Sequence, residues 1–144
     1  MNRAERRRQN KLTRKSTGKP YASRDRIFQI ETKKATKLTI NNALQYHNEG
    51  KIEEAKDIYK QILDTEPLHF DALHLLGVAC YQQENYSIAI ELLNKALIVT
   101  PDNAAALSNL GSVLNDIGQF IKAITNLQKA IKINPKFSEA HNNL

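Results

Sequence analysis

Three prolines recur at one fixed interval along this chain. Pro67, Pro101 and Pro135 are each 34 residues apart. Proline has no backbone N–H and disfavours helix at the residue before it, so each proline ends a helix and makes the chain turn. A period of this length is a signature of stacked helical repeats, in which each unit buries its apolar face against its neighbours. The spacing therefore predicts an array of helix pairs rather than one central core.

Other residue types recur at the same interval. Alanine occupies one position in all three units, and glycine follows leucine at another position in two of them. The alternative is an ordinary helical bundle whose prolines are equally spaced by accident. Several columns that repeat with the same period make this alternative improbable. The recurring positions are Ala55, Ala89 and Ala123; Tyr59, Leu93 and Leu127; Ile62, Ala96 and Ala130; and Ala43, Gly77 and Gly111.

These columns resemble the tetratricopeptide repeat, whose pattern runs W-x-x-L-G-x-x-Y, then A-x-x-x-F, then P. Leu-Gly occurs at 76–77 and 110–111, and Ala-x-x-x-Leu follows in both of those units. The first unit departs from the pattern, because Asn42 and Ala43 replace Leu-Gly. The resemblance covers residues 36–144 and implies an all-α solenoid of helix hairpins. Its units are a degenerate repeat 1 at 36–69, repeat 2 at 70–103, repeat 3 at 104–137 and the start of a truncated repeat 4 at 138–144.

Each unit is predicted to contain two helices. Apolar residues follow a helical stripe through residues 70–83 and again through 86–99. Gly77 and Gly111 fall inside first helices, where glycine costs about 1 kcal/mol relative to alanine. A close approach of the paired helix would offset that cost. The expected contacts are Ala89 for Gly77 and Ala123 for Gly111.

Positive charge is concentrated at the N-terminus. Residues 1–35 hold 12 Lys and Arg against 3 acidic residues, a net charge of +9, whereas residues 36–144 carry −3. We expect residues 1–26 to be a disordered basic tail and residues 27–35 a short apolar linker or cap. The tail is either a solvated segment that aids solubility or docks on the acidic repeats, or a weak contact for nucleic acid or anionic membrane. The candidate polyanion contacts are Arg3, Arg6, Arg7, Arg8, Lys11, Arg14 and Lys15.

The sequence contains no recognised motif for catalysis, cofactor binding or metal binding. P-loop, H-E-x-x-H, G-x-S-x-G and paired-cysteine zinc patterns are missing, and His47, His69, His74 and His141 share no metal-binding spacing. The single cysteine, Cys80, is expected to be a buried apolar residue. No run of 18 apolar residues and no signal-peptide pattern occurs. We therefore expect a non-enzymatic, cytoplasmic protein with no cofactor and no small-molecule substrate.

Tetratricopeptide arrays bind extended peptides or helices in the concave surface lined by their first helices, and the resemblance implies the same here. The later repeats also resemble the N-terminal arrays of O-linked N-acetylglucosamine transferases, in which a ladder of asparagines holds a peptide backbone. Asn109 and Asn143 match that ladder, and a side-chain amide can both donate and accept hydrogen bonds. The alternative is that these asparagines are simply polar surface. The candidate groove residues are Asn41, His74, Leu75, Val78, Ser108, Asn109, Ser112 and Asn143.

Two functions of different classes remain. We predict a protein–protein interaction module that binds a partner peptide or helix. The alternative is the substrate-recruiting N-terminal part of a larger enzyme, with a glycosyltransferase, sulfotransferase or methyltransferase domain beyond Leu144. The fourth unit begins at Ser138 and stops before its glycine position, so we expect a fragment of a longer protein. The open stacking face of the third unit could also support head-to-tail self-association.

Overall fold

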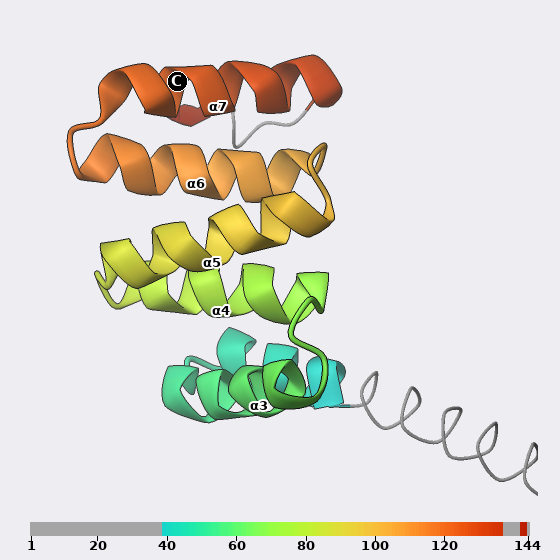
Figure 1. The fold of residues 1–144 in the computed structure, drawn as a ribbon. Helices are drawn as coiled ribbons and strands as arrows, with labels where there is room; N and C mark the ends of the chain where they lie inside the picture. Colours follow the sequence, from blue (N-terminus) through green and yellow to red (C-terminus); the bar gives the residue numbers. More distant parts are fainter. Residues whose placement is uncertain (1–38, 137–141, 144) are drawn as a thin grey trace, which may run out of the picture. The chain divides into compact units, whose positions relative to one another are not determined.

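The computed structural model describes residues 39–136 and 142–143, which form helix pairs stacked one on the next (Figure 1). By its contacts the chain divides into two units, residues 1–35 and 36–144, and every described residue lies in the second unit. The predictions for the basic tail, including its candidate polyanion contacts, and for the linker or cap concern residues outside the described ones.

Each pair in the described part of the chain has a first helix, called A here, and a second helix, called B. The A helices are residues 39–48, α4 (Phe70–Gln82) and α6 (Ala104–Asp116). The B helices are α3 (Ile52–Thr65), α5 (Tyr86–Val99) and α7 (Phe120–Ile133). Residues 142–143 are also helical, and no strand occurs among the described residues. The predicted all-α stack of helix hairpins is confirmed.

Each B helix ends two residues before a proline. α5 ends at Val99, and Thr100, the residue before Pro101, has φ −133° and ψ 85°, outside the helical region. The equivalent residues Glu66 and Asn134 have nearly the same dihedral angles. The ring of a following proline clashes with a helical residue, so the proline itself excludes helix at this position. The predicted helix stops are confirmed.

The A helices α4 and α6 begin with side-chain caps that were not predicted from the sequence. Asn103 Oδ1 accepts a hydrogen bond from the backbone N–H of Ala106 at 2.9 Å. At the equivalent place one repeat earlier, His69 Nδ1 accepts from the N–H of Ala72 at 3.2 Å. Each cap satisfies a backbone donor that the first helical turn would leave unpaired. A proline on one side and a cap on the other therefore limit the turn between repeats.

The turn inside each pair contains a residue in the left-handed conformation. Gly50 and Gly118 have φ of 78° and 79°, and the equivalent residue of the middle pair, Glu84, has φ of 60°. Glycine enters this region freely, whereas a residue with a Cβ atom does so at a cost of about 1–2 kcal/mol. The middle turn is therefore strained relative to the other two.

We expect Glu84→Gly to raise the free energy of unfolding by about 0.5–1 kcal/mol, because relief of the left-handed strain outweighs the extra freedom of glycine in the unfolded chain. Urea denaturation measures the change. The converse variant is Gly118→Ala, for which we expect a loss of about 1 kcal/mol even though open space surrounds its Cβ position. If Glu84→Gly made the protein less stable, the left-handed conformation of Glu84 would not be a source of strain.

Gly77 and Gly111 mark close approaches between A and B helices. A Cβ atom on Gly111 would lie 2.7 Å from Leu127 Cγ, and one on Gly77 would lie 3.0 Å from Leu93 Cγ. The predicted close approach is confirmed, and the nearest atoms at both glycines belong to leucine rather than to the predicted alanines. Ala123 follows at Gly111 with its backbone oxygen, at 3.3 Å. Helical side chains lean toward the N-terminus, so each leucine covers the turn that holds the alanine four residues before it.

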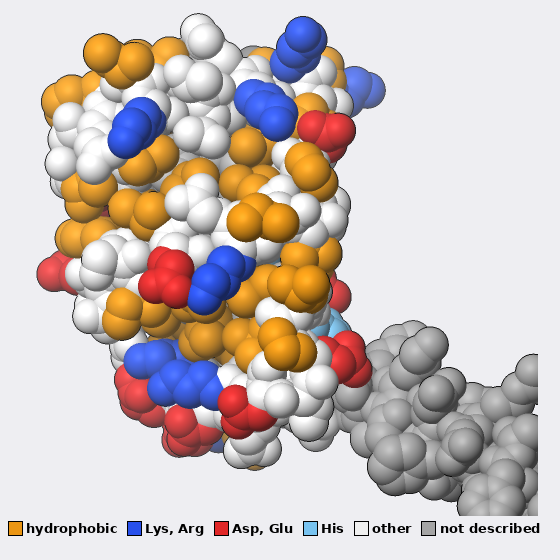
Figure 2. Space-filling view, viewed as in Figure 1, with side chains coloured by type: hydrophobic (Ala, Val, Ile, Leu, Met, Phe, Trp, Pro, Cys, Tyr) orange, Lys and Arg blue, Asp and Glu red, His pale blue; other side chains and the backbone are white. Residues whose placement is uncertain are grey.

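Charge changes sign along the stack (Figure 2). α3 carries four acidic residues and two lysines, whereas α7 carries three lysines and no acidic residue. Acidic side chains gather at the α3 end of the face shown in Figure 2, and lysines lie over α7. Because unlike charges attract and like charges repel across an interface, the two ends favour partners of opposite charge.

Candidate functional site

Hydrogen bonds join successive A helices along one face of the stack, formed by side chains of residues 39–48, α4 and α6 and called the A-helix face here. His47 Nε2 lies 2.8 Å from Gln82 Oε1, and the Tyr81 hydroxyl donates to Asp116 Oδ2 at 2.7 Å. His47 and Tyr81 occupy equivalent positions, as do Gln82 and Asp116. These contacts were not predicted, although both columns hold side chains able to form hydrogen bonds at one constant spacing.

Four of the predicted groove residues come together as two pairs. Asn109 Nδ2 of α6 lies 2.8 Å from His74 Nε2 of α4. Further along the stack, Asn143 Nδ2 donates to Ser112 Oγ at 2.7 Å. The Ser112 hydroxyl in turn donates to the backbone oxygen of Ser108 at 3.1 Å. The two asparagines of the predicted ladder are therefore both held by a side chain of the preceding A helix.

Both amides keep hydrogen-bonding capacity. A side-chain amide has two N–H donors and a carbonyl oxygen with two lone pairs, and each pair uses one nitrogen contact. Among the described residues, neither Asn109 Oδ1 nor Asn143 Oδ1 accepts a hydrogen bond. Asn109 is half-buried and Asn143 is exposed. Each can therefore offer a donor and an acceptor to a peptide backbone.

The other predicted groove residues differ in accessibility. Asn41 is exposed, while Leu75 and Val78 are half-buried and Leu75 packs against the core. Ser108 is 1% exposed, and its Oγ has no hydrogen-bond partner among the described residues. Serine is too short to extend past its neighbours, whereas the larger His74 at the equivalent position reaches the surface. A partner could not touch the Ser108 side chain, so Ser108 cannot contribute its hydroxyl to a binding surface.

Burial favours the neutral form of His74. Burial lowers the pKa of His74 below its ordinary value of 6.5, and the nearby carboxylate of Asp71 opposes this shift only in part. The geometry agrees, because a ring nitrogen that accepts the N–H of Asn109 must be unprotonated. The ring of Phe70 also packs against the imidazole, with ring centroids 5.6 Å apart. Neutral His74 can therefore act as the acceptor that orients Asn109.

We expect acid to weaken the fold through His74. A histidine with a lowered folded-state pKa stabilises the fold above its unfolded pKa, and that contribution is lost as the pH falls through the folded-state pKa. The free energy of unfolding should therefore fall between about pH 7 and pH 5. His74→Gln keeps an acceptor but does not titrate, so its loss should be smaller. Urea denaturation at several pH values measures both proteins, and an identical pH dependence would contradict this role.

Reactive groups are not gathered in the described part of the chain. No set of three or more His, Cys, Asp or Glu side chains there could hold a metal ion. Cys80 is buried, and burial raises the pKa of its thiol, which keeps it protonated as expected for a core residue. None of the described helices is long and apolar enough to cross a membrane.

Two profiles of one protein family match the chain. The profile described as tetratricopeptide repeat matches residues 46–114, and the profile described as TPR repeat matches residues 111–144. Together they extend from the first helix pair to the last residue. They cover both pairs of groove residues that the structure brings together.

Similar proteins include parts of large transferases. The probable UDP-N-acetylglucosamine–peptide N-acetylglucosaminyltransferase SPINDLY of Solanum lycopersicum is 29% identical over 72% of this chain, which covers 11% of that relative's length. A solved mutant of the Thermobaculum terrenum O-GlcNAc transferase is 31% identical, with a TM-score of 0.74 over 76% of this chain and 21% of the other. The first TPR of Spaghetti (RPAP3), bound to an HSP90 peptide, has a TM-score of 0.72 over 76% of this chain and 86% of its own. Its identity of 20% shows a shared fold alone.

Proposed function

Because the chain belongs to the tetratricopeptide repeat family of protein-interaction modules, we propose that it binds a segment of a partner protein along its A-helix face. Asn109 and Asn143 would hydrogen-bond the backbone of that segment, which makes binding tolerant of sequence. Leu75 and Val78 would contact its apolar side chains. Asn41 would extend the same face toward the first repeat.

The His74–Asn109 contact carries this proposal. An amide that must be ordered on binding loses conformational entropy, and that loss reduces affinity. Here one nitrogen of Asn109 is already engaged at 2.8 Å, so the amide is oriented before a partner arrives. Ser112 acts on Asn143 in the same way, with a 2.7 Å hydrogen bond. Both amides are therefore oriented before binding, unlike mobile surface side chains.

Removal of the side-chain amides of Asn109 and Asn143 tests the proposal. Peptides selected on the chain from a random library would serve as probes, with Kd measured by fluorescence anisotropy. We expect Asn109→Ala/Asn143→Ala to weaken binding by about 30-fold, the effect of two hydrogen bonds of about 1 kcal/mol each. Gln61→Ala, an exposed amide on the B helix α3, is the matched control and should change nothing. Equal Kd values for the double variant and the control would refute peptide binding by these amides.

A second candidate function is recruitment of substrates for a catalytic domain in the same polypeptide. The 31% identity to the O-GlcNAc transferase array favours it. In this case the repeats themselves would be non-catalytic, and a glycosyltransferase, sulfotransferase or methyltransferase domain would follow them. An antibody raised against residues 39–136 would report the mass of the endogenous polypeptide. A band near 16.3 kDa would contradict this second function.

The remaining partner proposals concern the tail and the ends of the stack. We propose a cytoplasmic protein whose basic tail makes weak contacts with nucleic acid or anionic membrane. Salt-sensitive binding of the chain to RNA should then be lost when residues 2–19 are deleted.

Head-to-tail association through the exposed side of α7 is also proposed. Light scattering over a concentration series would show it as a rising apparent mass.

A further inference from the structure

A groove of about 500 Å³ lies between the B helices α5 and α7, with α6 beneath it. Figure 1 shows α6 lying between the two B helices. Leu110 and Leu114 of α6 form the floor, while Ile90 and Asn94 of α5 line one wall. The volume falls within the range of ligand-binding sites, about 300–1,000 Å³. None of the residues that line the groove is among the candidate peptide-binding residues of the A-helix face, so a ligand here would be additional to the proposed function.

The equivalent surface one repeat earlier is covered by the side chain of Lys56. Lys56 and Lys60 of α3 occupy the positions equivalent to Ile90 and Asn94. The Lys56 side chain is only 12% exposed. A lysine can lay its long apolar stem over a hydrophobic floor while its ammonium group stays near polar partners. Ile90 and Asn94 are too short to cover the floor in this way.

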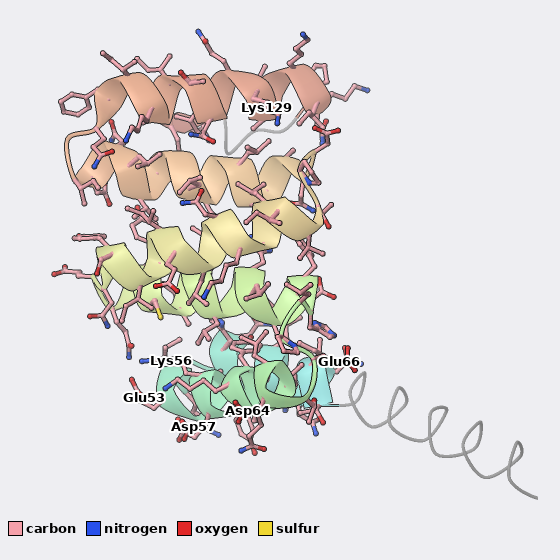
Figure 3. The ribbon with its side chains drawn as sticks, in the orientation of Figure 1. Glu53, Lys56, Asp57, Asp64, Glu66 and Lys129 are labelled. Atoms are coloured by element: carbon pink, nitrogen blue, oxygen red, sulfur yellow. The ribbon has the colours of Figure 1, made fainter. Side chains whose placement is uncertain are left out.

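A polar bridge that holds Lys56 in place is also missing from the later groove. Lys56 Nζ donates to Gln83 Oε1 at 2.6 Å and to Glu53 Oε1 at 3.2 Å, and the Glu53–Lys56 pair lies on α3 in Figure 3. Gln83 Nε2 closes the bridge by donating to Glu53 Oε1 at 2.5 Å. The residues equivalent to Glu53 and Gln83 are Ser87 and Ile117. Neither can form such a bridge, so side chains rather than the backbone leave this groove open.

Apolar and cationic side chains are exposed beside the groove. Ile121 is 84% exposed and Phe120 is 58% exposed. Ile121 and Lys122 line both the groove and an adjoining hollow of about 440 Å³ at the start of α7. Lys122 forms no ion pair with any described residue. Figure 2 shows hydrophobic side chains gathered over α5 and α7 on this face, and such exposed patches mark interaction sites.

We propose that the groove between α5 and α7 is a second docking surface, which binds a segment of a partner protein in which large apolar side chains stand beside carboxylates. The apolar side chains would pack mainly against Ile90 and the exposed Ile121, over a floor of Leu110 and Leu114 that is itself only 4% and 6% exposed, and a carboxylate would pair with Lys122. Charge decides the class of partner, because α7 carries three lysines and no acidic residue. A basic segment would be repelled there, so the chain's own basic tail does not fit.

Two fluorescent 12-residue peptides test this proposal on the full chain. One carries two leucines three residues apart among aspartates and serines, and the other has lysine in place of each aspartate. By anisotropy we expect the acidic peptide to bind at least about tenfold more tightly than the basic one. The variant Ser87→Glu/Ile90→Lys/Ile117→Gln transplants the bridge of the earlier repeat and should weaken the acidic peptide by at least about tenfold. Lys122→Gln should weaken it and reduce its salt dependence.

Controls separate this surface from the A-helix face. Asn109→Ala/Asn143→Ala should leave the affinity for the acidic peptide unchanged, so either proposal can fail without the other. Circular dichroism must show the triple variant to be folded, and Lys122→Gln is the second test if it is not. Equal binding of both peptides, or binding that neither groove variant alters, would overturn the proposal. So would a dimer in ultracentrifugation that the groove variants abolish, because the groove would then belong to a second copy of this chain.

Discussion

Leu93→Ala is expected to lower the free energy of unfolding by about 3–4 kcal/mol. Leu93 is fully buried, and its Cγ and Cδ2 atoms lie against the backbone position of Gly77. Alanine would leave a cavity that the glycine, without a side chain, cannot fill. Because repeats are stabilised largely by stacking on their neighbours, a cavity in the middle pair should weaken the pairs on both sides.

Urea denaturation followed by circular dichroism measures this loss. Ile98→Ala is the matched control, since it removes a large aliphatic side chain from the same helix but at a position that is 76% exposed. We expect the control to change the free energy of unfolding by no more than about 0.5 kcal/mol. Similar losses in the two variants would mean that the A–B contact at Gly77 does not dominate the stability of the pair.

Gly111→Leu is expected to lower the free energy of unfolding by about 3 kcal/mol, the upper part of the range for overpacking. A Cβ atom alone would already lie 2.7 Å from Leu127 Cγ and 2.9 Å from its Cδ2. Leucine adds three more carbons at that point, so α6 and α7 must separate. Gly77→Leu should cost less, because the corresponding distance in the middle pair is 3.0 Å. Hydrogen exchange should show protection lost first in α6 and α7.

A double variant tests whether Leu127 is the side chain that makes Gly111→Leu destabilising. In Gly111→Leu/Leu127→Ala the new leucine could occupy the space that Leu127 vacates, so the loss should be smaller than the sum of the two single losses. Gly111→Leu/Ile98→Ala joins substitutions that share no contact, and its losses should add within about 0.5 kcal/mol. If the losses are additive in both double variants, a clash with Leu127 is not the reason why position 111 requires glycine.

Helix ends were predictable where one residue sets them alone. The ring of Pro101 excludes helix at Thr100, and the same local effect operates before the other two prolines of the period. The side-chain caps were not predicted, although they too are local. Asparagine is a preferred cap residue, so Asn103 was a signal that could have been used, whereas histidine is an uncommon cap and its role at His69 depends on where the preceding turn places the ring. The period of 34 residues and the apolar stripes together predicted the stacked hairpins.

The candidate site was only partly predictable. The columns placed His74 and Asn109 on the same face of successive A helices, but their 2.8 Å contact depends on how α4 and α6 are rotated against each other. Ser108 occupies the same column as His74 and is nevertheless buried, because depth depends on side-chain length and on the neighbouring helix. The spacing of residues along the sequence specifies neither the relative rotation of two packed helices nor the depth at which a side chain is buried.

The repeat length, the helix-pair architecture and the columns of small residues could be predicted from the order of amino acids, since proline sterics and helical periodicity act within a few residues. Which side chains meet across those columns depends on how the helices pack. Leu127 covers Gly111, and the groove over α6 stays open while Lys56 covers its counterpart one repeat earlier. These outcomes depend on side-chain volume and direction between helices that pack in three dimensions, so equivalent positions in successive repeats take different roles.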